Sequence, residues 1–136
     1  MPSLKHLLNL IMVEAAWFST SLSCAQGTHM GYAQLAQGDG GHTTVFYPTD
    51  ATEIPVQRGP FDLSLASEAL PVKGNSRLIV ISHGSGGSPW VHTDLARALV
   101  RRGFVVAVPQ HSGDNYLDNS SPGPASWIKR PAEVSG

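Results

Sequence analysis

The stretch from Arg77 to Pro109 constrains the possible fold more than any other part of this sequence. It opens with Leu78 to Ile81, an unbroken run of aliphatic residues that is typical of a strand covered on both faces in a parallel sheet. A helical pattern follows, and Phe104 to Val108 then reads as a second buried strand. The order strand, helix, strand predicts a βαβ unit, which is right-handed in nearly all known cases.

The helix between the two strands has clear signals at both ends. Ser88 is a suitable N-cap residue, and Pro89 fits the first helical position, where its missing N–H is not needed. Gly103 is placed to stop the helix after two arginines. The spacing predicts one apolar, buried face of the helix, formed by Val91, Leu95, Ala98 and Leu99.

The glycine loop, Ser82 to Gly87, separates the first strand from the helix and allows four interpretations. A strand, a glycine-rich turn and a helix can bind phosphate, but the lysine of the P-loop pattern is missing. Ser85 could be a nucleophile on a sharp turn, although His83 stands where that motif has its first glycine. A His-Gly-x-Gly loop can also present a main-chain N–H to a developing oxyanion. The fourth interpretation is a tight turn without chemistry.

Two short strands are expected before this unit, at Tyr32 to Leu35 and Thr43 to Tyr47. The Gly/Asp cluster Gly38 to Gly41 between them indicates a hairpin. Residues Thr49 to Ser76 carry several prolines and glycines with little periodicity. They predict a long surface loop, with a short helical turn at Leu63 to Ala69.

The C-terminal part begins with a segment rich in Gly, Asn, Asp, Ser and Pro, from His111 to Pro124. This composition predicts a long irregular loop, and such loops in compact domains tend to be functional or mobile. A further helix is expected to begin at Pro131.

Composition excludes several classes of function. A net charge of −1 over 136 residues offers no electrostatic footprint for binding nucleic acid. The single cysteine, Cys24, allows no intramolecular disulfide and no multi-cysteine zinc site, and the sequence indicates no metal or other cofactor. With 41% hydrophobic residues, the chain has an ordinary globular composition and room for one domain.

Residues 1–25 read as an export signal that precedes a domain over residues 26–136. The apolar run of this segment is shorter than the roughly 20 residues of a membrane-spanning helix, so no membrane span is expected. Glu14 opposes membrane insertion, and a cytosolic amphipathic N-terminus or a mis-assigned start codon are the alternatives. The expected location is therefore extracellular or periplasmic. The signals are, in order, Lys5, the apolar run Leu7 to Val13, and the small residues Ser23 and Ala25 before Gln26.

The residues Leu78 to His111, reading LIVISHGSGGSPWVHTDLARALVRRGFVVAVPQH, resemble the oxyanion loop, first helix and next strand of the α/β-hydrolases. The resemblance is closest to the branch of dienelactone hydrolases and platelet-activating-factor acetylhydrolases. It implies an α/β fold, the N-terminal half of a hydrolase, with an antiparallel strand pair followed by the parallel βαβ unit. It also includes Tyr47-Pro48-Thr49, Gly59-Pro60-Phe61 and Trp127 to Val134, and so covers most of Gly31 to Gly136.

This resemblance implies an esterase or lactonase that acts on a small substrate by nucleophilic acyl transfer, without a cofactor. By position, Ser85 matches the family residue whose main-chain N–H completes the oxyanion hole, and its hydroxyl would be incidental. Gly84 and Gly86 would give the loop its shape, and His83 would brace it. His111 follows the second strand at the edge where open α/β sheets build their sites, and would line the substrate pocket.

One part of the family pattern is missing. No Gly-x-Ser-x-Gly occurs in the chain, and the nucleophile, acid and histidine of the family triad have no counterpart in it. We therefore expect a truncated hydrolase domain that is inactive or barely active alone. Its strand Leu78 to Ile81 would form an exposed apolar edge open to self-association. A small-anion-binding module and a half that complements a partner chain are the two alternatives.

Overall fold

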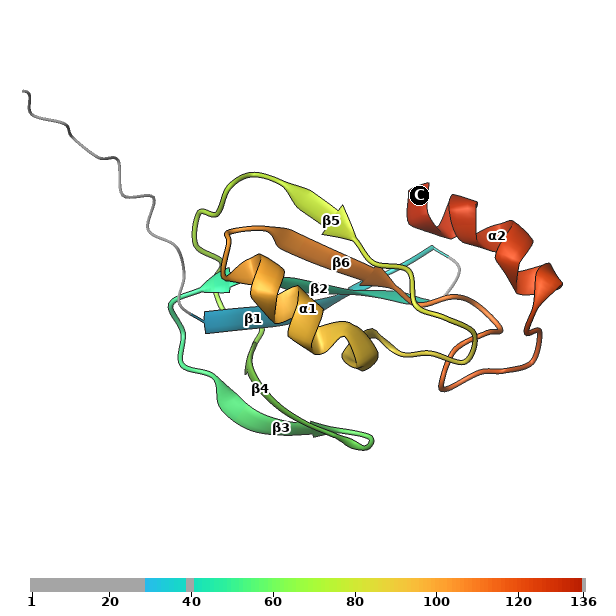
Figure 1. The fold of residues 1–136 in the computed structure, drawn as a ribbon, viewed down its shortest axis with the longest axis horizontal. Coiled ribbons are helices and arrows are strands. Elements are labelled where there is room, and N and C mark those ends of the chain that lie inside the picture. The colour runs from blue at the N-terminus through green and yellow to red at the C-terminus, as the bar shows by residue number, and fades with distance from the viewer. Residues whose placement is uncertain (1–28, 39–40, 136) are drawn as a thin grey trace, which may run out of the picture.

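The computed structural model describes residues 29–38 and 41–135. It is a mixed α/β fold with a six-stranded sheet in the order β3-β4-β1-β2-β6-β5 (Figure 1). The expected export signal, residues 1–25, lies outside the described residues, and so do Asp39 and Gly40 of the expected hairpin turn. The elements are β1 (His29–Ala36), β2 (His42–Thr49), β3 (Ile54–Arg58), β4 (Phe61–Ser67), β5 (Leu78–Val80), the 3₁₀ helix η2 (Pro89–His92), α1 (Thr93–Val100), β6 (Val105–Pro109) and α2 (Pro124–Ser135).

Strands β1 and β2 form the antiparallel pair that the sequence predicts. They pair along their whole length, with Tyr32 opposite Phe46 and Ala33 opposite Val45. β1 also lies parallel to β4, and β2 lies antiparallel to β6. The hairpin is therefore the centre of the sheet.

The predicted βαβ unit is present. β5 and β6 are parallel neighbours, with Ile79 opposite Val106, and α1 lies against one face of the sheet (Figure 1). Ser88 stands at the N-cap of η2, and Pro89 opens this 3₁₀ helix, which leads directly into α1. Gly103 follows α1 with a φ of +83°, a left-handed conformation that suits glycine and ends the helix here.

The buried face of α1 differs from the predicted one. Thr93, Ala96 and Val100 are buried, whereas Val91 and Leu95 are exposed. Val91 belongs to η2, whose tighter 3₁₀ winding rotates it out of register with the α-helical face. The prediction was therefore wrong for Val91 and Leu95, whereas Leu99 packs against the core as expected.

The long loop predicted for Thr49 to Ser76 was wrong, because residues 54–67 form the β3–β4 hairpin. Gly59 lies in its turn with a φ of +58°. Leu63 packs against the core and Leu65 is fully buried in it, so alternate residues of β4 face inward. This two-residue period replaces the helical turn that was expected at Leu63 to Ala69.

Helix α2 begins at Pro124. The predicted start at Pro131 was wrong. Gly123 has a φ of +80° before the helix, and Pro124 suits the first helical position. Pro131 lies inside the helix, where its missing N–H removes one helical hydrogen bond. The preceding segment, His111 to Gly123, is irregular as predicted. No helix among the described residues, α2 included, is long and apolar enough to cross a membrane.

The hydrophobic core lies between α1 and one face of the sheet. Phe46, Val106 and Val108 of the sheet are buried there, together with Trp90 of η2. Trp90 contacts Tyr32 and Phe46 edge to face, with ring centroids 5.8 and 6.2 Å apart. These aromatic contacts attach η2, and with it the end of the glycine loop, to the centre of the sheet.

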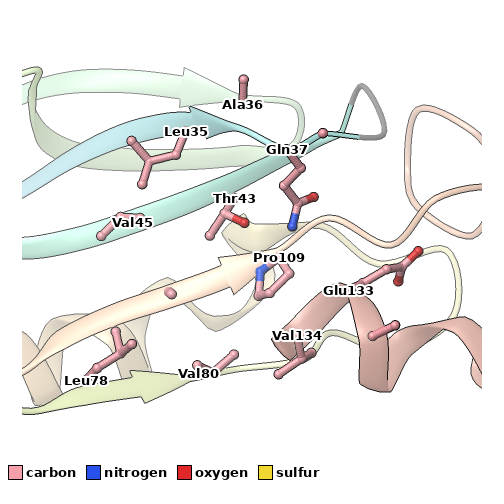
Figure 2. Close-up of a pocket in the computed structure, with 13 residues that line it drawn as sticks. Leu35, Ala36, Gln37, Thr43, Val45, Leu78, Val80, Pro109, Glu133 and Val134 are labelled. Atoms are coloured by element: carbon pink, nitrogen blue, oxygen red, sulfur yellow. The ribbon is translucent and has the colours of Figure 1, made fainter. Parts of the chain in front are cut away.

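The opposite face of the sheet is open near strand β5. Leu78 and Val80 are 62% and 40% exposed, and within the described part of the chain β6 is the only strand beside β5. An apolar groove of about 740 Å³ runs along this face to α2 (Figure 2). Its lining includes Leu35, Val45, Leu78, Val80 and Pro109 of the sheet side and Ala132, Glu133 and Val134 of α2.

Candidate functional site

Three segments meet at the C-terminal ends of β5 and β6: the glycine loop, the irregular segment after β6, and helix α2 (Figure 1). Because β5 and β6 are parallel neighbours, the residues that follow them start at the same edge of the sheet. Ser82 follows β5 and His111 follows β6. Two hydrogen-bonded clusters of side chains lie at this edge.

The first cluster surrounds the buried carboxylate of Asp114. Its Oδ1 accepts hydrogen bonds from the Ser85 hydroxyl at 2.6 Å and from the Gly86 N–H at 2.8 Å. Its Oδ2 accepts one from the Arg130 guanidinium at 2.9 Å. The bond from Ser85, followed by those from Gly86 and Arg130, lowers the pKa of Asp114 to about 2 although burial opposes ionisation. At neutral pH the loop therefore holds an anion supplied by the chain itself.

These bonds fix the roles that the loop residues can take. The Ser85 hydroxyl anchors the loop to Asp114, and the expectation that this hydroxyl is incidental to the chemistry stays a prediction. Its partner is a carboxylate and not an imidazole base, which does not favour Ser85 as the nucleophile. The main-chain N–H of Ser85 takes part in no hydrogen bond among the described residues, and the residue is exposed. One donor of the loop is thus free to meet a ligand.

His83 is almost fully buried under the loop, and both of its ring nitrogens are engaged. Nδ1 donates to the Gly84 carbonyl oxygen at 2.8 Å, and Nε2 accepts the main-chain N–H of His111 at 3.4 Å. Burial, the largest effect, lowers the pKa of His83 and keeps the ring neutral at pH 7. This geometry supports the bracing role assigned to His83 from the sequence.

The glycine loop also borders a small hollow of about 210 Å³. Gly87 closes a turn by donating to the Gly84 carbonyl oxygen at 3.0 Å, and a Cβ on Gly87 would lie 2.9 Å from that oxygen. A side chain on Gly87 would therefore disturb this turn. The other walls come from the β3–β4 turn, η2 and the segment after β6, and include Phe61, Trp90 and Tyr116.

The second cluster is a chain of three side chains. Ser82 Oγ lies 2.8 Å from Nε2 of His111, and Nδ1 of His111 lies 2.7 Å from Oε2 of Glu133. His111 is fully buried, the Glu133 side chain is 10% exposed, and Ser82 is exposed. Glu133 bonds to His111 from α2 and also lines the apolar groove (Figure 2). The arrangement is that of a hydroxyl, an imidazole and a carboxylate in series.

The structure brings every residue predicted for the site to this one edge of the sheet, namely His83, Gly84, Ser85, Gly86 and His111. His111, expected to line the pocket, is fully buried, and its substrate contact stays a prediction. Sequence reasoning missed Ser82, although its place directly after an apolar strand is a usable signal. It also missed Asp114, Arg130 and Glu133, which no local pattern marks.

No group of three or more His, Cys, Asp or Glu side chains in the described ranges is placed to hold a metal ion. No protein-family model matches this chain, and no curated protein matches it.

Proposed function

We propose that this chain acts in the hydrolysis of carboxylic esters or lactones, with the main-chain N–H of Ser85 as an oxyanion-hole donor. In acyl transfer a nucleophile attacks the carbonyl carbon, and the carbonyl oxygen takes up negative charge. Ser85 donates a hydrogen bond to that oxygen, while Gly84 and Gly86 keep the backbone open to it. The reaction needs no cofactor, and its substrate is a small molecule.

The observation that carries the proposal is the Ser85 N–H, which has no hydrogen-bond partner in the part of the chain that the structure describes, on a loop that is otherwise held rigidly. The Ser85 hydroxyl and the Gly86 N–H donate to Asp114. The Arg130 guanidinium donates both to this carboxylate and, at 2.9 Å, to the His83 carbonyl oxygen of the glycine loop. A donor that is fixed before the substrate arrives stabilises developing charge without reorganisation, which is the main requirement of an oxyanion hole.

The position of the loop supports the same proposal. It lies at the C-terminal edge of parallel strands, where open α/β sheets bind their ligands. The resemblance of Leu78 to His111 to the α/β-hydrolases motivates the finer assignment, the N-terminal half of that fold, and export of the chain from Gln26 onward remains part of the proposal. The nucleophile of the hydrolases that this stretch resembles has no counterpart in the chain. If only the residues that match the family act, we therefore expect hydrolysis by this chain to be weak or absent.

The alternative of a small-anion site is not favoured by the loop geometry. The Gly86 N–H and the Ser85 hydroxyl, the donors that a phosphate would use, already bind the Asp114 carboxylate.

The Ser85 N–H is tested by two substitutions at the same position. Ser85→Pro deletes the N–H and should lower the turnover of p-nitrophenyl acetate by about 10²–10³-fold, as the loss of other oxyanion-hole donors does. Ser85→Ala keeps the N–H and loses only the hydroxyl anchor to Asp114, so its turnover should fall by only about a few fold. Circular dichroism of both variants shows whether the loop change has spread to the fold.

A second readout needs no nucleophile. Methylphosphonate imitates the tetrahedral anion, and its titration should shift the Ser85 amide resonance in ¹⁵N spectra of the wild-type chain. If neither hydrolysis above the buffer rate nor this shift is observed, the proposed oxyanion site is wrong.

The exposed edge of β5 predicts self-association. Leu78 is an exposed apolar residue on a strand that, among residues 29–38 and 41–135, has a neighbour on one side only, and such edges pair with other chains. Sedimentation at increasing concentration should show dimers or larger species, and Leu78→Lys should shift them toward monomers. The matched control is Leu70→Lys, because Leu70 is 85% exposed and lies outside every strand. Equal effects of the two lysines would contradict edge pairing.

A further inference from the structure

We infer that Ser82 is the nucleophile of this chain, with His111 as its general base and Glu133 as the residue that positions the imidazole. The inference rests on the proposed ester hydrolysis and names the group that attacks the substrate. It is motivated by the two short contacts in series, 2.8 Å from Ser82 Oγ to His111 Nε2 and 2.7 Å from His111 Nδ1 to Glu133 Oε2. A nucleophile within hydrogen-bond distance of a base, which a third group orients, is the signature of nucleophilic catalysis.

The direction of the hydrogen bonds follows from the chemistry of Glu133. An ionised carboxylate can only accept, so the proton of the neutral imidazole lies on Nδ1. Nε2 then carries the lone pair and accepts the Ser82 hydroxyl. The Ser112 N–H donates to the second oxygen of Glu133 at 3.1 Å and holds the carboxylate in place. His111 therefore has the tautomer that a general base needs.

The reaction follows from this tautomer. Ser82 Oγ forms a bond to the ester carbonyl carbon, its proton moves to His111 Nε2, and the charged oxygen is met by the Ser85 N–H in the same loop. The bond from the carbonyl carbon to the leaving oxygen then breaks, and Nε2 returns the proton to yield the alcohol. Water repeats the sequence on the acyl-serine and releases the carboxylic acid and Ser82.

The apolar groove reaches the three side chains at Glu133, which lines it. Ser82 stands two residues after Val80, just beyond the end of β5, and Val80 lines the groove. His111 stands two residues after Pro109, just beyond the end of β6, and Pro109 lines the groove too. Glu133 belongs to both the groove and the chain of hydrogen bonds. The fitting substrate is a carboxylic ester whose acyl part is an apolar chain.

The exposures of the three side chains agree with these roles. Ser82 is exposed and can be reached by a substrate, whereas His111 is fully buried and contacts Ser82 through Nε2. The ring of His111 also packs against His83, with centroids 4.7 Å apart, which fixes its plane. A purely structural bond between α2 and the sheet is the competing explanation, and it does not require an accessible serine.

The first measurement is covalent labelling of the full chain by an alkyl fluorophosphonate, located by mass spectrometry of peptides. The Ser82 oxygen displaces fluoride, so the label should appear on Ser82 and be lost in Ser82→Ala. His111→Asn should lower the labelling rate by about 10²-fold or more, because Asn cannot take the proton. The control Ser64→Ala removes an exposed serine of β4 outside the site and should leave labelling unchanged.

The second measurement is hydrolysis of p-nitrophenyl octanoate and acetate. Ser82→Ala should lose roughly 10³-fold or fall to the buffer rate. Glu133→Gln should lower kcat by about 10²-fold or more with an unchanged KM, a split that loss of an α2 anchor alone would not produce. The octanoate should be the better substrate by kcat/KM, and a preference for acetate would contradict the groove as the acyl site.

The two measurements separate the inference from the proposed function. Label on Ser82 without ester hydrolysis would support the activated serine and overturn the hydrolase proposal. Hydrolysis that persists in a folded Ser82→Ala would overturn the Ser82 assignment and leave the hydrolase proposal standing. Absence of label from Ser82 in the folded wild-type chain would show that the three side chains serve only to attach α2.

Discussion

Trp90→Ala is expected to lower the free energy of unfolding by about 3–5 kcal/mol, the usual range for removing a buried tryptophan. Trp90 is only 5% exposed, and its ring contacts Tyr32 and Phe46 edge to face. The Arg58 guanidinium lies 5.4 Å from the Trp90 ring centroid and also donates to the Tyr32 hydroxyl. Loss of the indole therefore loosens β1, β2 and the β3–β4 hairpin together.

Trp127→Ala is the matched control, because it removes the same side chain from the exposed surface of α2. Trp127 is 56% exposed, and its loss should change the stability by less than about 1 kcal/mol. Urea unfolding followed by far-ultraviolet circular dichroism gives both values without relying on tryptophan fluorescence. Similar losses in the two variants would show that the aromatic cluster is not the centre of the core.

Trp90→Ala should also affect the candidate site. Trp90 lies in η2, directly after the glycine loop, and it lines the small hollow beside Gly86 and Gly87. The loop is thus held at one end by the aromatic cluster and in its middle by Asp114. We expect Trp90→Ala to weaken phosphonate binding at Ser85 even at temperatures at which the chain is still folded.

The βαβ unit could be predicted because its signals are local. The apolar run at Leu78 to Ile81, the Ser88-Pro89 start and the Gly103 stop lie within one short stretch, and each acts through backbone sterics or solvation of the nearest turn. The two central strands were found for the same reason. The buried face of α1 was predicted only in part, because Val91 lies in a 3₁₀ turn that no residue type distinguishes from the first turn of an α-helix.

The β3–β4 hairpin could not be predicted from local signals. Pro55, Gly59 and Pro60 read as loop residues, and the strand residues between them gain their conformation from pairing and from the burial of Leu65. Tertiary contacts decide strand formation more than intrinsic preference does. Pro55 also stands on an edge strand, where a missing N–H is tolerated.

The candidate site was predicted in part. The loop residues were found because strand, glycine loop and helix are contiguous in the sequence. Their partners were missed because Asp114 contacts Ser85 across 29 positions and Glu133 contacts His111 across 22. A carboxylate in an irregular loop or a helix looks like an ordinary solvated side chain until the fold brings it to a donor.

Acid is expected to destabilise the fold through Asp114. Its pKa is about 2 in the folded chain, against an ordinary value of 3.8, and the bond from the Ser85 hydroxyl is the largest cause. In the unfolded chain the carboxyl binds its proton at the higher pH, so between about pH 4 and pH 2 unfolding takes up a fraction of a proton at this site, largest near the middle of the window. The stabilising contribution is complete above this window and is lost as the pH falls through it.

Urea midpoints measured from pH 6 to pH 2 would show this loss. Asp114→Asn should make the midpoint depend less steeply on pH, because the contribution of the Asp114 carboxyl is then absent. The amide can still accept the Gly86 N–H, but it offers no charge to Arg130, so the variant should already be less stable at pH 7. Asp118→Asn is the matched control: the pKa of Asp118 is also lowered, mainly by the Ser120 side chain, but this carboxylate is exposed. If Asp118→Asn flattened the acid slope as much as Asp114→Asn, the buried cluster would not be the acid-sensitive element. Protonation of Asp114 should also loosen the loop that carries Ser85, because it weakens the hydrogen bonds that the carboxylate accepts from Ser85 and Gly86.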